Sequence, residues 1–118
     1  MKNGAFHKRL GHALAGIRLV WRREKTFRTH VRSALAALAL AAVLGVGPIW
    51  WALIILCIAL VTALEAMNSA LEYLLDRLHP EFHPEIGFAK DAAAGAVLLA
   101  SIGSAAVGAL MLLGWWPG

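Results

Sequence analysis

Acidic and amide side chains recur at helical spacing in the second half of a long apolar segment. Glu65, Asn68, Glu72 and Asp76 follow one another at steps of three, four and four residues. Side chains at these steps lie on one stripe of an α-helix. Because a helix rises about 1.5 Å per residue, Glu65 and Glu72 are about 10 Å apart along the helix axis. A carboxylate stripe offers the hard oxygen ligands that Mg²⁺ prefers.

A basic residue follows this stripe, at the end of a loop predicted at residues 77–90. Lys90 and Asp91 open the next apolar stretch. A lysine close to Mg²⁺-binding carboxylates can neutralise phosphate charge, which favours a phosphate site. The alternative is that the polar groups only join helices across a bundle, as Asn and Glu do in membranes. The chain has neither a P-loop pattern nor a kinase-type glycine loop, so phosphate chemistry here would be unconventional.

Composition places these residues in a membrane protein. The 118 residues are 60% hydrophobic and 15% charged, and the mean hydropathy is +0.69, whereas soluble domains are about 25% charged. Most of the 11 Lys and Arg residues lie at or before Arg32. A basic head before an almost uncharged body is typical of a cytoplasmic N-terminus. This distribution argues against nucleic acid as a partner, although the pI is about 9.9.

Three membrane spans are predicted in a single all-α domain, at residues 31–46, 49–76 and 91–116. The uncharged stretch between Arg32 and Glu65 is too long for one crossing, and Gly45-Val46-Gly47-Pro48 interrupts it as a turn would. Trp50 and Trp51 follow the turn as expected interfacial anchors. The loop at 77–90 is then cytoplasmic.

The basic head is predicted to form an amphipathic helix over about residues 5–28. Its apolar residues recur at steps of three and four, and its basic residues occupy other positions. Such a helix lies on the cytoplasmic leaflet of a membrane. The apolar positions are Phe6, Leu10, Ala13, Leu14, Ile17 and Trp21.

Two segments resemble the small prokaryotic diacylglycerol kinases, a family that includes undecaprenol kinases. The segments are EAMNSALEYLLDRLHPEFHPEIGFAKDAAAGAVLL (65–99) and GIRLVWRREKTFRTH (16–30). The first contains the family pattern E-x-x-N-[ST]-A-x-E-x-x-x-D and the motif A-K-D-x-x-[AS]-[AG]-A-V. The second has the family's acidic residue, Glu24, ahead of Phe27-Arg28. The resemblance covers nearly the whole chain.

The resemblance implies a homotrimeric lipid kinase of the bacterial inner membrane, with a surface helix and three transmembrane helices in each subunit. It implies that Glu65 is the general base that takes the proton from a lipid alcohol. It also implies that Glu24 and Glu72 bind Mg²⁺ together with ATP, in an active site that faces the cytoplasm. The remaining polar residues are then expected to bind the nucleotide and its phosphates: Asn68, Asp76, Lys90, Asp91, Glu81 and His83.

The expected lipid alcohol is undecaprenol, with diacylglycerol as the alternative. The diacylglycerol kinase branch tends to have a small hydroxyl residue after the Ala-Lys-Asp motif, where this chain has Ala94, and its loop differs from HPEFHPEIGF.

Two other classes of protein are alternatives to a lipid kinase. A small multidrug exporter would have its membrane Glu in the first of four spans, and a non-catalytic membrane assembly protein would not turn over ATP.

Overall fold

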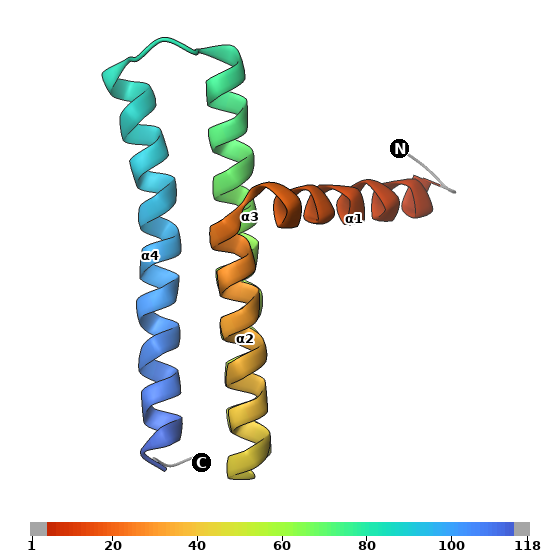
Figure 1. The fold of residues 1–118 in the computed structure, drawn as a ribbon, viewed down its shortest axis with the longest axis vertical. Helices are drawn as coiled ribbons and strands as arrows, with labels where there is room; N and C mark the ends of the chain where they lie inside the picture. Colours follow the sequence, from red (N-terminus) through yellow and green to blue (C-terminus); the bar gives the residue numbers. More distant parts are fainter. Residues whose placement is uncertain (1–4, 115–118) are drawn as a thin grey trace.

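The computed structural model describes residues 5–114 and folds them into four α-helices (Figure 1). These are α1 (Ala5–Arg23), α2 (Lys25–Leu44), α3 (Pro48–Leu78) and α4 (Pro84–Leu112). Within the described range there is no β-strand, and the predicted all-α class is confirmed. The last part of the span predicted at 91–116 lies outside the described residues.

Three of the helices are long and apolar enough to cross a membrane, as the sequence predicts. Helix α2 has 20 residues, α3 has 31 and α4 has 29. At about 1.5 Å per residue, α3 is about 46 Å long, whereas the hydrocarbon core of a bilayer is about 30 Å thick. Part of α3 therefore extends beyond the hydrocarbon core.

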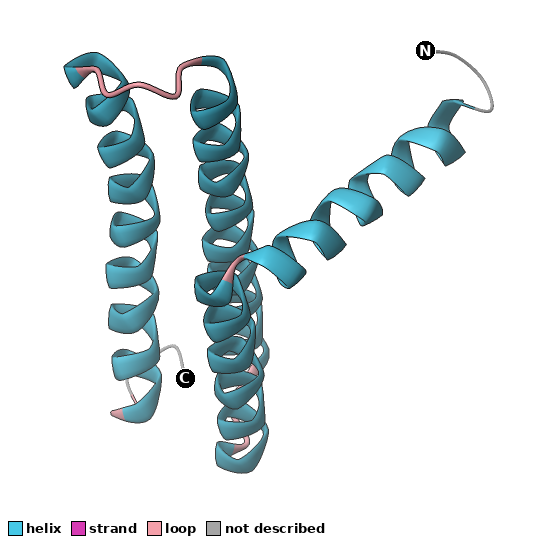
Figure 2. Ribbon diagram, turned by 45° about the horizontal axis from the view of Figure 1, so that its top comes forward, coloured by secondary structure: helices cyan, strands magenta, loops and turns pink. Residues whose placement is uncertain are grey.

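The three long helices run side by side and α1 leaves them at a steep angle (Figures 1 and 2). Helix α3 packs along α4 in an antiparallel pair, and α2 packs against α3. The loop between α3 and α4 lies at one end of the bundle, and the turn between α2 and α3 lies at the other end. In Figure 1 the loop end of α3 and α4 projects beyond the level of α1.

The turn between α2 and α3 lies where the glycines and proline predict it. Gly45 ends α2 with φ +65°, a left-handed conformation that favours glycine. Its N–H donates to the carbonyl of Ala42, and the N–H of Val46 donates to the carbonyl of Ala41. Pro48 then begins α3. Proline suits this position, because the N–H that it lacks would have no partner within the helix.

The predicted head helix is too long at its C-terminal end. Helix α1 ends at Arg23, because Glu24 has an extended conformation and α2 begins at Lys25. The guanidinium of Arg28 donates to the carbonyl oxygens of Trp21 and Arg22 at the end of α1. This cation satisfies carbonyl groups at the negative end of the helix dipole and stabilises the corner.

The connection between α3 and α4 is shorter than the loop predicted at 77–90. Helix α3 continues to Leu78, and α4 already begins at Pro84. His83 ends the connection, and its Nδ1 accepts a hydrogen bond from the N–H of Glu85 at 3.1 Å. A side-chain acceptor followed by proline is a strong helix start. Residues 84–90 are therefore helical.

The core of the bundle lies at the end opposite the α3–α4 loop. Ala41, Trp50, Ile54 and Met111 form its buried cluster. Trp50 is only 2% exposed, so it packs between the helices and does not face a membrane interface as expected. The other end of the bundle holds most of the polar side chains.

Candidate active site

Glu65 is a buried carboxylate in the apolar helix α3. The residue is 4% exposed. Its Oε2 atom lies 3.2 Å from Nε2 of His30, which α2 supplies. A charged side chain at the centre of a membrane helix costs about 2.5–3.5 kcal/mol on insertion scales, and pairing lowers that cost. In this site the partner is a histidine from a different helix.

Burial decreases along the polar stripe of α3 toward the α3–α4 loop. The continuous helix holds all four residues of the stripe on one face, as their spacing predicts. Asn68 and Glu72 are half-buried, and the side chain of Asp76 is 66% exposed. Oδ1 of Asn68 and Oγ of Ser69 are buried and have no hydrogen-bond partner in the part of the chain that the structure describes. Such atoms are rare in folded proteins, and an ordered water or a bound ligand is a common explanation for them.

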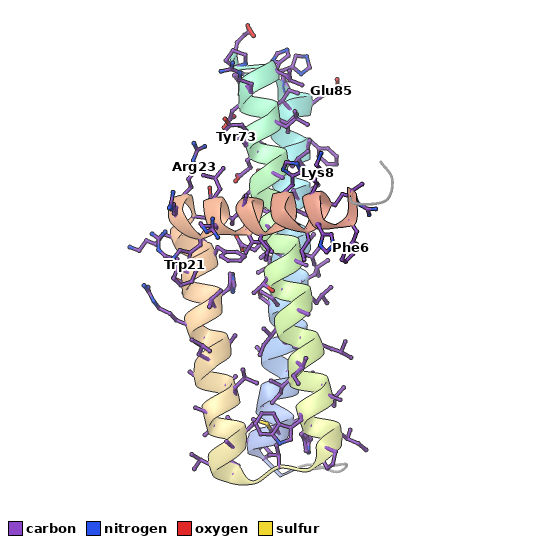
Figure 3. The ribbon with its side chains drawn as sticks, turned by 90° about the vertical axis from the view of Figure 1, so that its right-hand side faces the viewer. Phe6, Lys8, Trp21, Arg23, Tyr73 and Glu85 are labelled. Carbon is purple, nitrogen blue, oxygen red and sulfur yellow. The ribbon has the colours of Figure 1, made fainter. Side chains whose placement is uncertain are left out.

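Glu24 approaches this stripe from the corner between α1 and α2. The corner borders a hollow of about 240 Å³ between α1 and α3, which Glu24, Ser69 and Tyr73 help to line. The guanidinium of Arg23 lies 5.3 Å from the centre of the Tyr73 ring (Figure 3). The charges of Glu24 and Glu72 both repel the carboxylate of Glu65. Three carboxylates from two segments are thus close enough to interact.

Lys90 joins α4 to the outer part of the stripe. Its Nζ atom forms an ion pair and hydrogen bond with Oδ1 of Asp76 on α3. The Lys90 side chain is 32% exposed, so its ammonium group is still reachable from outside. This contact brings together two residues that the sequence places on either side of the loop. Asp91, the next residue on α4, is exposed.

Glu81 and His83 lie in the connection between α3 and α4. Nδ1 of His79 is 3.1 Å from the backbone oxygen of Glu81 and 3.8 Å from its Oε1. His83 packs edge-on against the His79 ring and begins α4. These contacts organise the loop itself, and a role of Glu81 and His83 toward a nucleotide stays a prediction.

The carboxylates are of the ligand type that Mg²⁺ prefers, but the described part of one chain does not complete a metal site by itself. Among residues 5–114, no three side chains of the usual ligand types gather closely enough to hold an ion. Mg²⁺ is commonly bound through one or two carboxylates together with substrate phosphates and water. Glu24 and Glu72, the two carboxylates that act on Glu65, are of this ligand type.

An apolar groove of about 320 Å³ begins at His30 and continues between α2, α3 and α4 toward Met111. Its few polar side chains are those of His30, Ser33, Thr62, Ser101 and Ser104. His30 therefore lies at the boundary between the groove and the carboxylate of Glu65.

His30 is the residue that sequence reasoning missed. Its partner Glu65 is distant in the chain and belongs to another helix, so no local spacing relates the two. The available signal was a histidine directly before the membrane span predicted at 31–46, because ionisable residues close to a span are often functional.

The fold and this arrangement define a class of protein. Three helices that can cross a membrane hold buried and half-buried ionisable groups near one end, which is the pattern of a membrane protein with a functional polar site. Residues 11–112 match the family described as prokaryotic diacylglycerol kinase. The chain belongs to that family.

Individual relatives agree with this assignment. The chain is 36% identical over 108 residues to the undecaprenol kinase of Bacillus subtilis (strain 168), covering 92% of this chain and 88% of that protein. It is 38% identical over 95 residues to the diacylglycerol kinase of Escherichia coli (strain K12), covering 80% and 78%. The diacylglycerol kinase of Helicobacter pylori (strain J99) is 36% identical over 95 residues, covering 80% and 74%. The predicted family and enzyme class, a membrane lipid kinase, are confirmed.

Proposed function

We propose that this lipid kinase transfers the γ-phosphate of ATP, bound with Mg²⁺, to the hydroxyl of undecaprenol. The observation that carries the proposal is the buried Glu65 carboxylate, held in an apolar helix beside two further carboxylates. A carboxylate in this position has no packing role that an apolar side chain would not fill better. It can serve as a base for an alcohol that arrives from the membrane.

Each polar residue predicted from the sequence then has a proposed role. Glu65 accepts the hydroxyl proton while the alcohol oxygen forms a bond to the γ-phosphorus and the bond to ADP breaks. Glu24 and Glu72 hold Mg²⁺, which when bound neutralises phosphate charge. Asn68 offers its unpartnered buried oxygen, and its amide N–H groups can bind phosphate. The remaining residues contribute to nucleotide binding: Asp76, Lys90, Asp91, Glu81 and His83.

The membrane orientation follows from α1, proposed here to be an amphipathic helix on the cytoplasmic leaflet. Its apolar residues are exposed, Phe6 by 66% and Leu14 by 52%. In Figure 3, Phe6 and Trp21 lie on the side of α1 that faces the apolar end of the bundle, and Lys8 and Arg23 lie on the opposite side. If α1 lies at the inner membrane surface, the corner beside Ser69 and Tyr73 marks that surface. Glu65 is then about one turn deeper.

A homotrimer would complete the site. Several large apolar side chains of α3 face outward, among them Leu56 at 66% exposure. No set of three metal ligands is assembled within the described part of one chain. Both features are accounted for if neighbouring subunits cover the helices and approach the acidic cluster. The lipid also shields apolar surface, so the number of subunits is to be measured on the protein in detergent or nanodiscs.

The lipid acceptor is the finer part of this proposal, and both named relatives bear on it. One similar protein is an undecaprenol kinase and another is a diacylglycerol kinase. Ala94, which follows the Ala-Lys-Asp motif, removes a hydroxyl that could hydrogen-bond a glycerol group. Undecaprenol is therefore proposed as the preferred acceptor, and diacylglycerol as the alternative.

Offered both lipids in one reconstituted assay with labelled ATP and Mg²⁺, the protein is expected to phosphorylate undecaprenol with the higher kcat/KM. The two phosphorylated lipids are separated by thin-layer chromatography and counted. An Ala94→Ser variant is the matched comparison, and it should shift the ratio toward diacylglycerol. Equal or greater labelling of diacylglycerol by the unchanged protein would reverse the assignment. Labelling of neither lipid would refute the kinase reaction proposed for this chain.

A further inference from the structure

The carboxylate of Glu65 has one electrostatically favourable neighbour among residues 5–114. His30 lies within ion-pair distance of it, whereas Glu24 and Glu72 are like charges that repel it. The two side chains approach through Nε2 and Oε2, at 3.2 Å. The Glu65 side chain is 6% exposed and that of His30 is 24% exposed, so His30 is the more accessible partner of the pair.

The contact also fixes where the carboxylate points. A glutamate has three rotatable side-chain bonds, so a carboxylate without a partner can occupy several positions. The contact with Nε2 of His30, at 3.2 Å, restricts the position of the Oε2 atom. The Oε1 atom is then left for another group, and reacting atoms must be held within a few tenths of an ångström to react efficiently.

We propose that His30 is a positioning residue for the phosphoryl transfer. The N–H at Nε2 holds Oε2 of Glu65, so that Oε1 accepts the proton of the lipid alcohol. As that O–H bond breaks, the alcohol oxygen bonds to the γ-phosphorus and ADP leaves with the electrons of the broken P–O bond. The proton remains on Glu65 until it passes to solvent. This inference rests on the proposed function, because it needs Glu65 to act as the base.

The position of His30 at the end of the apolar groove is consistent with this role. His30 lines the groove, whose other walls come from all three long helices. A residue there lies between apolar surface on one side and the carboxylate on the other. His30 can therefore orient the base at the border that a lipid hydroxyl has to reach.

Two amide variants test the inference, because they differ in where they carry a donor. The amide nitrogen of Gln can occupy the place of Nε2, whereas that of Asn is too short to reach it. We expect His30→Gln to keep kcat within about 3-fold of the unchanged protein, and His30→Asn to lower it by about 10- to 100-fold. KM for ATP should be the same in both, since His30 does not contact the nucleotide in this mechanism. Initial rates against ATP concentration with saturating undecaprenol provide both constants.

A double variant separates positioning from a general effect on packing. In a Glu65→Gln background, adding His30→Asn should cause no further loss of kcat, because the two residues act as one unit. Equal kcat for His30→Gln and His30→Asn would overturn the role of His30. So would a loss on adding His30→Asn to Glu65→Gln that is as large as the loss that His30→Asn causes in the unchanged protein. An unchanged protein that phosphorylates no lipid alcohol would instead refute the proposed function. The two failures are thus distinguishable.

Discussion

Replacing Glu65 by Gln is expected to lower kcat for lipid phosphorylation by about 10²- to 10⁴-fold, the usual contribution of a general base. The amide has nearly the same volume as the carboxylate, so the packing of the buried site on α3 is preserved. The amide of Gln cannot accept a proton from an alcohol at the pH of the assay. The rate is measured as transfer of labelled γ-phosphate into extracted lipid, with undecaprenol and ATP both saturating.

Glu85→Gln is the matched control for this variant. Glu85 lies in the first turn of α4, is exposed, and belongs to no part of the proposed site. The same chemical change there should leave kcat within about 2-fold of the unchanged protein. Nucleotide binding and subunit number should be the same in both variants. If Glu65→Gln keeps the kcat of the unchanged protein, Glu65 is not the base.

Replacing Lys90 by Met is expected to lower kcat/KM for ATP by about 10- to 150-fold. A hydrogen bond to a charged group contributes about 1.5–3 kcal/mol, which corresponds to that range. Lys90 lies at the open end of the site, where its ammonium group pairs with Asp76. Most of the loss should appear in KM for ATP. Initial rates over a range of ATP concentrations, at constant free Mg²⁺, measure it.

Two further variants define what Lys90 contributes. Lys90→Arg keeps the positive charge and should recover part of the lost kcat/KM, because phosphate accepts hydrogen bonds from either cation. Lys8→Met makes the same change on α1, far from the stripe in the chain, and should leave KM for ATP unchanged. A Lys90→Met protein with the kcat/KM of the unchanged protein would show that Lys90 does not bind the phosphates.

The order of the helices and the polar stripe could be predicted because local residue patterns determine them. Gly45 and Pro48 interrupt an apolar run that is too long for one span, and the structure has its turn there. Glu65 and Glu72 lie two turns apart on a continuous helix, so their common face follows from helix geometry alone. These features depend on a few neighbouring residues, which a sequence displays directly.

Features that depend on contacts between distant segments could not be predicted in this way. The corner at Glu24 depends on Arg28 folding back to the end of α1. Trp50 is buried because Ala41 and Met111 from other helices surround it, although a tryptophan next to a turn is equally suited to a membrane interface. The pairing of His30 with Glu65 likewise joins two helices. The early start of α4, in contrast, could be predicted from the sequence, because Pro84 after His83 is a start signal for a helix.

The experimental structure of the protein in a lipid bilayer, with Mg²⁺, a non-hydrolysable ATP analogue and undecaprenol, tests the proposed site most directly. The proposed mechanism predicts Mg²⁺ on the carboxylates of Glu24 and Glu72, and the γ-phosphate within hydrogen-bonding distance of Lys90. It also predicts the undecaprenol hydroxyl beside Oε1 of Glu65. A nucleotide bound elsewhere on the chain, with Glu65 facing neither phosphate nor hydroxyl, would contradict it.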